Sequence, residues 1–109
     1  MRAYERMLNY VKVWTTSDSS SETVPSTSRQ FDLAKLLVEE MKSLGIEDAH
    51  VDEKSYVYGT LPATKGYEDK AKLGFIAHLD TSEDMSGQNV NPQIIENYDG
   101  KDINLGESG

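Results

Sequence analysis

Residues 73–81 read LGFIAHLDT and decide the fold that we expect for this chain. The stretch begins as an apolar run and ends with a histidine and an aspartate two positions apart. A short apolar run that follows a polar loop containing Gly and Lys is typical of a buried β-strand. In open α/β sheets, ligands bind just beyond the carboxyl ends of the strands. His78 and Asp80 therefore occupy the position at which such a sheet carries its functional site.

The spacing of His78 and Asp80 has a chemical meaning. Side chains on a strand alternate between its two faces, so residues two apart point the same way. A neutral imidazole is a good zinc ligand, and it usually needs a partner on its other ring nitrogen to fix its orientation. Asp80 is placed to be that partner or a neighbouring ligand. The motif is short, and the alternative is a polar strand end that faces water.

A second pair, His50 and Asp52, has the same spacing but charged neighbours on both sides, namely Glu47, Asp48, Glu53 and Lys54. We interpret that segment as the solvated arm of a hairpin and His50 as a surface residue. The polar loop after Asp80 contains Glu83 and Asp84, which could be further metal ligands. We favour a solvated loop for these two carboxylates.

Patterns elsewhere in the chain predict an α/β fold. Apolar residues at helical spacing predict helices at about residues 3–14 and 28–44. The second helix begins at a capping-box pattern, residues 27–30, and stops at Gly45. Clusters of β-forming residues predict strands at about 48–53, 56–61, 72–79 and 93–98. The Ser/Thr-rich segment 15–28 is a loop, for which a functional role and a flexible linker are both open.

Composition narrows the classes of function. The 109 residues suffice for one small domain. The absence of cysteine excludes disulfides and thiolate metal ligands. A net charge of −8 argues against nucleic acids and anionic membranes as partners. The sequence has neither an apolar span of about 20 residues nor a signal peptide, so we expect a cytoplasmic protein. It ends at Gly109 just after a hairpin arm has begun, and we expect it to be part of a larger domain.

Several segments, taken together and in order, resemble one known family. They are residues 10–12, 15–18, 21–27, 30–34, 56–63, 74–81 and 92–100. The family that they resemble is peptidase T, the zinc aminotripeptidases, and the resemblance covers nearly the whole chain as about the first quarter of the family's length. At Leu79 the family often has Met, which is apolar and of similar volume, so the substitution puts nothing in doubt.

The resemblance implies a fold and a site. Residues 1–109 would be the N-terminal part of a three-layer α/β/α zinc-peptidase catalytic domain with a mixed sheet. The complete site would hold two zinc ions. His78 would be a ligand of one zinc, and Asp80 would be a catalytic-site residue that holds the imidazole. The bridging aspartate, the general-base glutamate and the other ligands would lie beyond this chain.

The resemblance also implies a reaction, which is release of the N-terminal residue from tripeptides by zinc-activated water. We expect this chain alone to be inactive, and to self-associate through an open sheet edge. Two alternatives are open. One is a non-catalytic binding or scaffold domain of the same fold. The other is a related zinc dipeptidase or deacylase.

Overall fold

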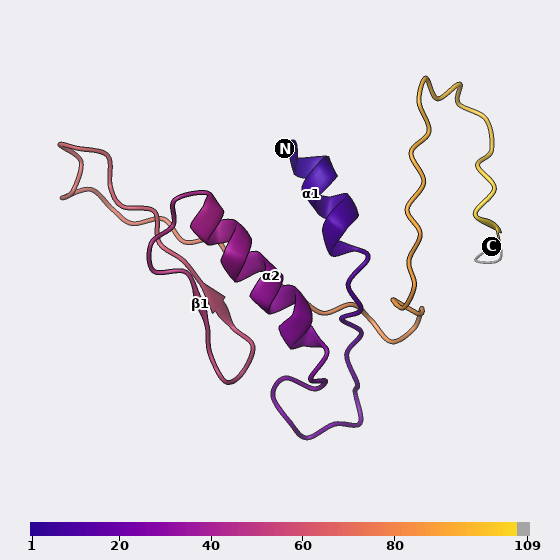
Figure 1. Cartoon of the computed structure of the whole chain (residues 1–109), viewed down its shortest axis with the longest axis horizontal. Coiled ribbons are helices and arrows are strands. Elements are labelled where there is room, and N and C mark those ends of the chain that lie inside the picture. Colours follow the sequence, from indigo (N-terminus) through magenta and orange to yellow (C-terminus); the bar gives the residue numbers. More distant parts are fainter. Residues whose placement is uncertain (107–109) are drawn as a thin grey trace.

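A computed structural model describes residues 1–106 of the chain. It contains two helices, α1 (Ala3–Tyr10) and α2 (Gln30–Ser43), and two short strands, β1 (His50–Val51) and β2 (Val57–Tyr58). The strands are antiparallel, with His50 opposite Tyr58. In Figure 1, α2 lies between the β1–β2 hairpin and α1. The prediction of an α/β arrangement with two helices is confirmed at this coarse level.

Helix α2 holds most of the small core. Its apolar positions recur on one face, and the buried residues are Leu33, Ala34 and Val38. Gly45, with a φ of +86°, ends the helix in the left-handed conformation that glycine adopts without strain. The predicted capping box does not form, because α2 has no side-chain cap. The Thr27 hydroxyl instead donates to the Thr16 carbonyl, 2.9 Å away.

Helix α1 is shorter than predicted and ends at Tyr10 rather than near Trp14. After Tyr10 the backbone tightens, since Val13 N–H donates to the Tyr10 carbonyl three residues back. Trp14 leaves the helix and its ring receives the Arg29 guanidinium, 3.8 Å from the ring centroid. Tyr10 contacts the Glu40 carboxylate through its hydroxyl, and this contact joins α1 to α2.

The segments predicted as strands at 72–79 and 93–98 differ in the structure. Within residues 1–106 neither segment is assigned as a strand. Residues 71–80 form neither helix nor strand, and Phe75 and Ile76 are 89% and 102% exposed rather than buried. A strand requires a neighbouring strand for its N–H and C=O groups and an apolar cover for its side chains. The described part of the chain provides neither along this run, so the predicted strand does not form there.

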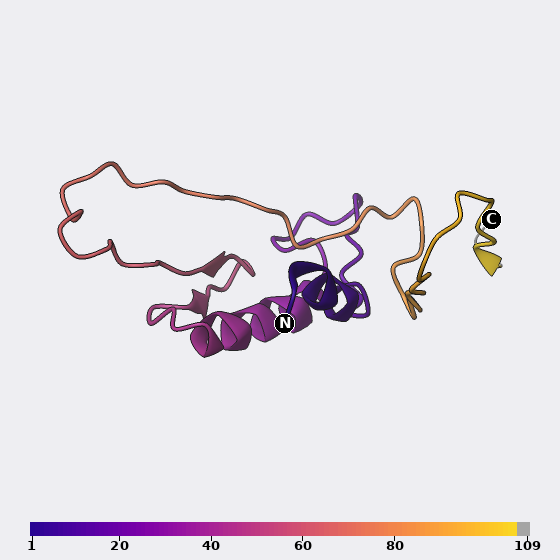
Figure 2. The same cartoon turned by 90° about the horizontal axis from the view of Figure 1, so that it is seen from above.

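The molecule is open in consequence. Its radius of gyration is 17.5 Å, whereas a compact domain of this length would have about 13 Å. Figure 2 shows the segment that follows β2 as a wide excursion that returns past α1. The C-terminal part, coloured yellow, lies apart from both helices in both views. No helix within residues 1–106 is long and apolar enough to cross a membrane.

Candidate functional site

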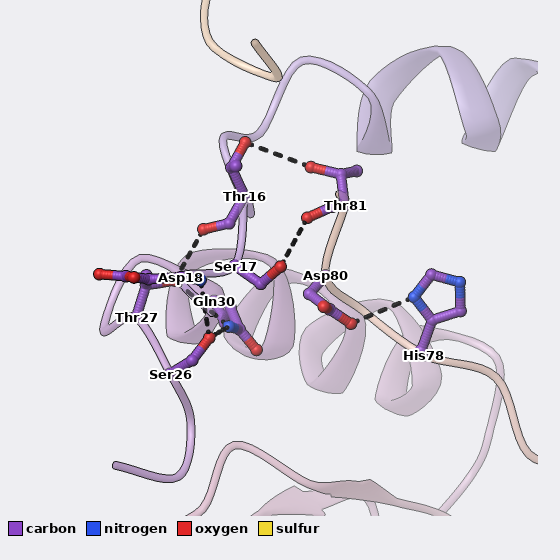
Figure 3. Close-up of polar contacts among 9 residues, drawn as sticks. All are labelled: Thr16, Ser17, Asp18, Ser26, Thr27, Gln30, His78, Asp80 and Thr81. Atoms are coloured by element: carbon purple, nitrogen blue, oxygen red, sulfur yellow. Dashed lines mark hydrogen bonds and ion pairs between the residues drawn. The ribbon is translucent and has the colours of Figure 1, made fainter. Parts of the chain in front are cut away.

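The structure brings His78 and Asp80 together. The Nδ1 atom of His78 lies 3.1 Å from Oδ1 of Asp80, and the two side chains point toward each other in Figure 3. An ionised carboxylate only accepts hydrogen bonds, so this bond forms when Nδ1 carries the ring proton. The lone pair then resides on Nε2. The imidazole is 84% exposed, so Nε2 is open to a ligand.

A parallel β-bridge fixes the residue that follows Asp80. Thr81 pairs with Thr16, far away in the sequence. Ser17 N–H donates to the Thr81 carbonyl at 3.0 Å, and Thr81 N–H approaches the Thr15 carbonyl at 3.4 Å. The Ser17 hydroxyl donates to the same Thr81 carbonyl at 3.0 Å. The backbone next to the candidate pair is therefore held by the Ser/Thr-rich loop (Figure 3).

This loop is itself tied to α2. Thr27, which is 9% exposed, bonds the Thr16 carbonyl through its hydroxyl. The side-chain amide of Gln30, the first residue of α2, donates to the hydroxyls of Thr27 and Ser26, each at 3.2 Å. Of the two roles left open for segment 15–28, these contacts favour a structural part of the site. Composition alone indicated a loop here and did not predict the contacts of Thr16 and Ser17, whereas Thr27 is predicted as part of a helix cap and instead bonds Thr16.

The acidic residues of the loop that follows Asp80 accept hydrogen bonds from serine residues. Glu83 accepts from the backbone N–H and the hydroxyl of Ser19, at 3.1 and 2.5 Å. Asp84 accepts from the Ser82 hydroxyl at 2.6 Å. Neither bond reaches the His78 ring, and both carboxylates are exposed, as the solvated-loop interpretation predicted.

The donors within residues 1–106 do not amount to a complete zinc site. A catalytic zinc usually has three protein ligands and an open position. In the described part of the chain no three His, Asp or Glu side chains gather closely enough to hold a metal ion. His78 and Asp80 supply one imidazole and one carboxylate. They fit a portion of a zinc site, and no catalytic step is assigned to this chain by itself.

Open hollows lie along the segment that carries the pair. One, of about 760 Å³, is lined by residues 23–26, 54–58 and 75–80. Another, of about 880 Å³, lies between α1, α2 and residues 75–81. His78 and Asp80 line both hollows, so space for a ligand or for further polypeptide exists beside the pair.

Hydrogen bonds lower the pKa of two carboxyl groups, one in the Ser/Thr-rich loop and one beside the hairpin. Bonds from Ser20 are the main cause of the lowered pKa of Asp18, in the Ser/Thr-rich loop. Bonds from Thr60 are the main cause of the lowered pKa of Asp48, beside the hairpin. Each set of donors stabilises the ionised form. Both carboxylates are therefore structural acceptors at neutral pH.

The second His-x-Asp pair behaves differently. His50 Nδ1 lies 2.7 Å from the Asp48 carbonyl, and the ring stacks on Tyr58 with centroids 5.2 Å apart. Asp52 accepts from the backbone N–H groups of Lys54 and Tyr56 in the hairpin turn. His50 is exposed, so the prediction of a surface residue is confirmed. The two His-x-Asp pairs have equal spacing, but the histidine bonds its aspartate at His78 and Asp80, whereas His50 and Asp52 bond other groups.

Comparison with known proteins shows which family the chain is related to. No family model matches the chain. Peptidase T from Alkaliphilus oremlandii is 57% identical over 104 residues, which are 94% of this chain and 25% of that protein. Peptidase T from Bacillus subtilis is 54% identical over 103 residues, 94% of this chain and 25% of the relative. This chain is a relative of peptidase T. A third such protein, from Clostridium perfringens, is 50% identical over 105 residues, 96% of this chain and 26% of the relative.

The resemblance to the peptidase T family is thereby confirmed. The chain spans about a quarter of the length of the curated relatives that it matches. The relationship to a peptidase family rests on identities of 50–57% over alignments that cover 94–96% of this chain. The coarse fold of the described residues, two helices with a two-stranded sheet, is compatible with part of an α/β domain.

Proposed function

We propose that this chain contributes to a metallo-aminopeptidase, the whole of which releases the N-terminal residue from tripeptides with zinc-activated water. The chain would form the N-terminal part of a three-layer α/β/α catalytic domain with a mixed sheet. The observation that carries the proposal is the contact of His78 Nδ1 with Asp80, 3.1 Å long, in a relative of peptidase T. A bonded Nδ1 and an exposed Nε2 are what a zinc-binding imidazole needs.

The two residues have separate roles in this proposal. His78 would bind one of two zinc ions through Nε2. Asp80 would keep the ring in the tautomer that leaves Nε2 unprotonated, and would hold its orientation. Zinc, when bound, lowers the pKa of a coordinated water and polarises a peptide carbonyl. The remaining ligands and the general base are proposed to come from outside residues 1–106.

The overall reaction is hydrolysis of the first peptide bond. The water oxygen bonds to the carbonyl carbon, the C–N bond breaks, and a proton passes to the leaving amine nitrogen. The products are a free amino acid and a dipeptide. The proposed substrate is a tripeptide, as the resemblance to peptidase T implies. The net charge of −8 argues against nucleic acid and anionic membrane as partners. A cytoplasmic location completes the proposal.

The test uses the complete protein that contains this chain, loaded with zinc. We expect cleavage of a tripeptide at its first bond and no cleavage of a dipeptide. The variant Asp80→Asn should lose about 10–100-fold in kcat/KM, the usual effect of removing a partner of a metal-bound histidine. His78→Ala should lose at least as much, while His50→Ala, the matched control in the other His-x-Asp pair, should keep the activity.

Other outcomes separate the alternatives. Cleavage of dipeptides or of N-acyl amino acids, with tripeptides left intact, would identify the related dipeptidase or deacylase. Peptide binding without any hydrolysis, unaffected by His78→Ala, would identify the non-catalytic scaffold. Either result overturns the tripeptidase proposal.

A further inference from the structure

We propose that Ser17 is a positioning residue for the His78–Asp80 pair. Its hydroxyl and its backbone N–H both donate to the carbonyl of Thr81, each at 3.0 Å. These two hydrogen bonds, which we call the clamp, hold the carbonyl of the residue that directly follows Asp80, the carboxylate that bonds the imidazole. This positioning role rests on the proposed function, whereas the hydrogen-bond geometry does not depend on it.

Two donors on one carbonyl are a stronger restraint than a single β-bridge bond. A carbonyl oxygen has two lone pairs, and Ser17 alone engages it twice. The N–H of Thr81 faces the same segment and approaches the Thr15 carbonyl at 3.4 Å. The hydroxyl of Thr81 lies 3.3 Å from that of Thr16. Backbone and side chain of Thr81 are thus both held by one short segment, residues 15–17.

The clamp connects Thr81 to the buried core of the chain. Thr27 and Thr15 are 9% and 2% exposed, and Thr27 links Thr16 to the start of α2. Residues 71–80 have no strand assignment of their own and are largely exposed. The direction of Asp80 therefore depends on the loop that holds its neighbour, rather than on packing of the apolar run before it.

A second anchor lies on the far side of Thr81. Ser19 binds the Glu83 carboxylate through its N–H and hydroxyl. The loop then returns to the bridge at Gly87, where an added Cβ would lie 2.8 Å from Thr16 Oγ1 and 2.9 Å from Thr81 Oγ1. Only a residue without a side chain fits there unless the hydroxyls move. Residues 81–87 thus close over the same bridge that Ser17 fastens.

The test measures the tautomer of His78 directly in this chain, without metal. Nitrogen-15 NMR of labelled histidine distinguishes a protonated Nδ1 from a protonated Nε2, at a pH where both imidazoles are neutral. The wild type should show an excess of the Nδ1–H form at His78. Ser17→Ala should lower the ratio of Nδ1–H to Nε2–H by about 2–10-fold, the effect of one net hydrogen bond. Ser17→Thr, which keeps the hydroxyl, should restore the ratio.

The controls separate positioning from loss of structure. Ser21→Ala removes a hydroxyl from the same loop whose partner is Thr23, and it should leave the His78 ratio unchanged. His50 reports on general changes within the same spectrum. Helicity measured by circular dichroism reports on α2. An unchanged His78 ratio in Ser17→Ala, with helicity intact, overturns the proposal.

If Ser17→Ala loses helicity, the exposed variant Ser19→Ala decides, because it weakens only the second anchor by removing the hydroxyl bond to Glu83 while the backbone bond is kept. A shift of the His78 tautomer toward Nε2–H in Ser19→Ala supports positioning by the loop, and an unchanged ratio overturns it. These outcomes are independent of peptidase activity. A tautomer shift in a protein that cleaves no tripeptide would retain the positioning role and reject the proposed function.

Discussion

Replacing Thr27 by Val tests whether the Ser/Thr-rich loop is fastened to the core. The two side chains have nearly the same shape, so the substitution removes a hydroxyl and adds little else. The lost bond is the one from Thr27 Oγ1 to the Thr16 carbonyl, 2.9 Å long at a side chain that is 9% exposed. The amide of Gln30 also loses an acceptor, but it keeps the Ser26 hydroxyl at 3.2 Å.

The expected loss in the free energy of unfolding follows from the hydrogen bonds that the substitution removes. A neutral hydrogen bond contributes about 0.5–1.5 kcal/mol net, and an abandoned buried group costs about 1–3 kcal/mol. Thr16 is half-buried, so water reaches its carbonyl in part and the penalty falls in the lower range. We expect Thr27→Val to lower the free energy of unfolding by about 1–2 kcal/mol.

The assay is urea denaturation followed by the fluorescence of Trp14, the single tryptophan of the chain. Trp14 is a local reporter, because its indole N–H donates to Thr16 Oγ1 at 3.0 Å. The matched control is Thr23→Val in the same loop, at an exposed hydroxyl that bonds the Pro25 carbonyl. Equal transitions for the two variants would refute the anchoring role of Thr27.

Three further predictions concern the site, assembly and pH. The isolated chain should bind zinc only weakly and hydrolyse no peptide, since it lacks a three-donor cluster in its described part; submicromolar affinity in isothermal titration, abolished by His78→Ala, would contradict this. The chain should self-associate through residues 72–79, and Ile76→Lys should reduce the mass seen by light scattering more than Ile94→Lys, an equally apolar exposed control; a strictly monomeric wild type would count against it. Because the folded-state pKa of Asp18 is lowered, its stabilisation is present above the unfolded pKa near 3.8 and is lost as pH falls through the folded value. Ser20→Ala, which removes the hydroxyl bond and keeps the backbone bond, should raise that pKa in an NMR titration, and an unchanged value would exclude the Ser20 hydroxyl as its main cause.

Local patterns predicted the parts of the fold that depend on local physics. Helix α2 was predicted within two residues because its apolar face and Gly45 both act within a few turns of backbone. The His78–Asp80 contact was predicted from a spacing of two, which places side chains together on any extended backbone. The prediction that Thr27 caps α2 is wrong, because its hydroxyl donates to the Thr16 carbonyl instead.

Features that depend on distant residues escaped prediction. The bridge between Thr16 and Thr81 joins positions 65 residues apart, and no short pattern announces such a pairing. The apolar run 73–77 was predicted to be a buried strand because it has the composition of one. Burial, however, depends on partners, and the described residues place none beside it. Composition therefore indicated what this run can become rather than its state in this chain.

Two kinds of interaction, one local and one long-range, build the candidate site. Spacing along the chain brings the imidazole of His78 to Asp80, and this needs no sheet. The position of the pair relative to α2 requires a long-range restraint, which the hydroxyls of Ser17 and Thr27 supply. Hydrogen bonds are directional, whereas apolar contact is not. A polar clamp can therefore fix the direction of Asp80 even where the apolar run beside it is exposed, which is why the site has a defined geometry in a chain with so small a core.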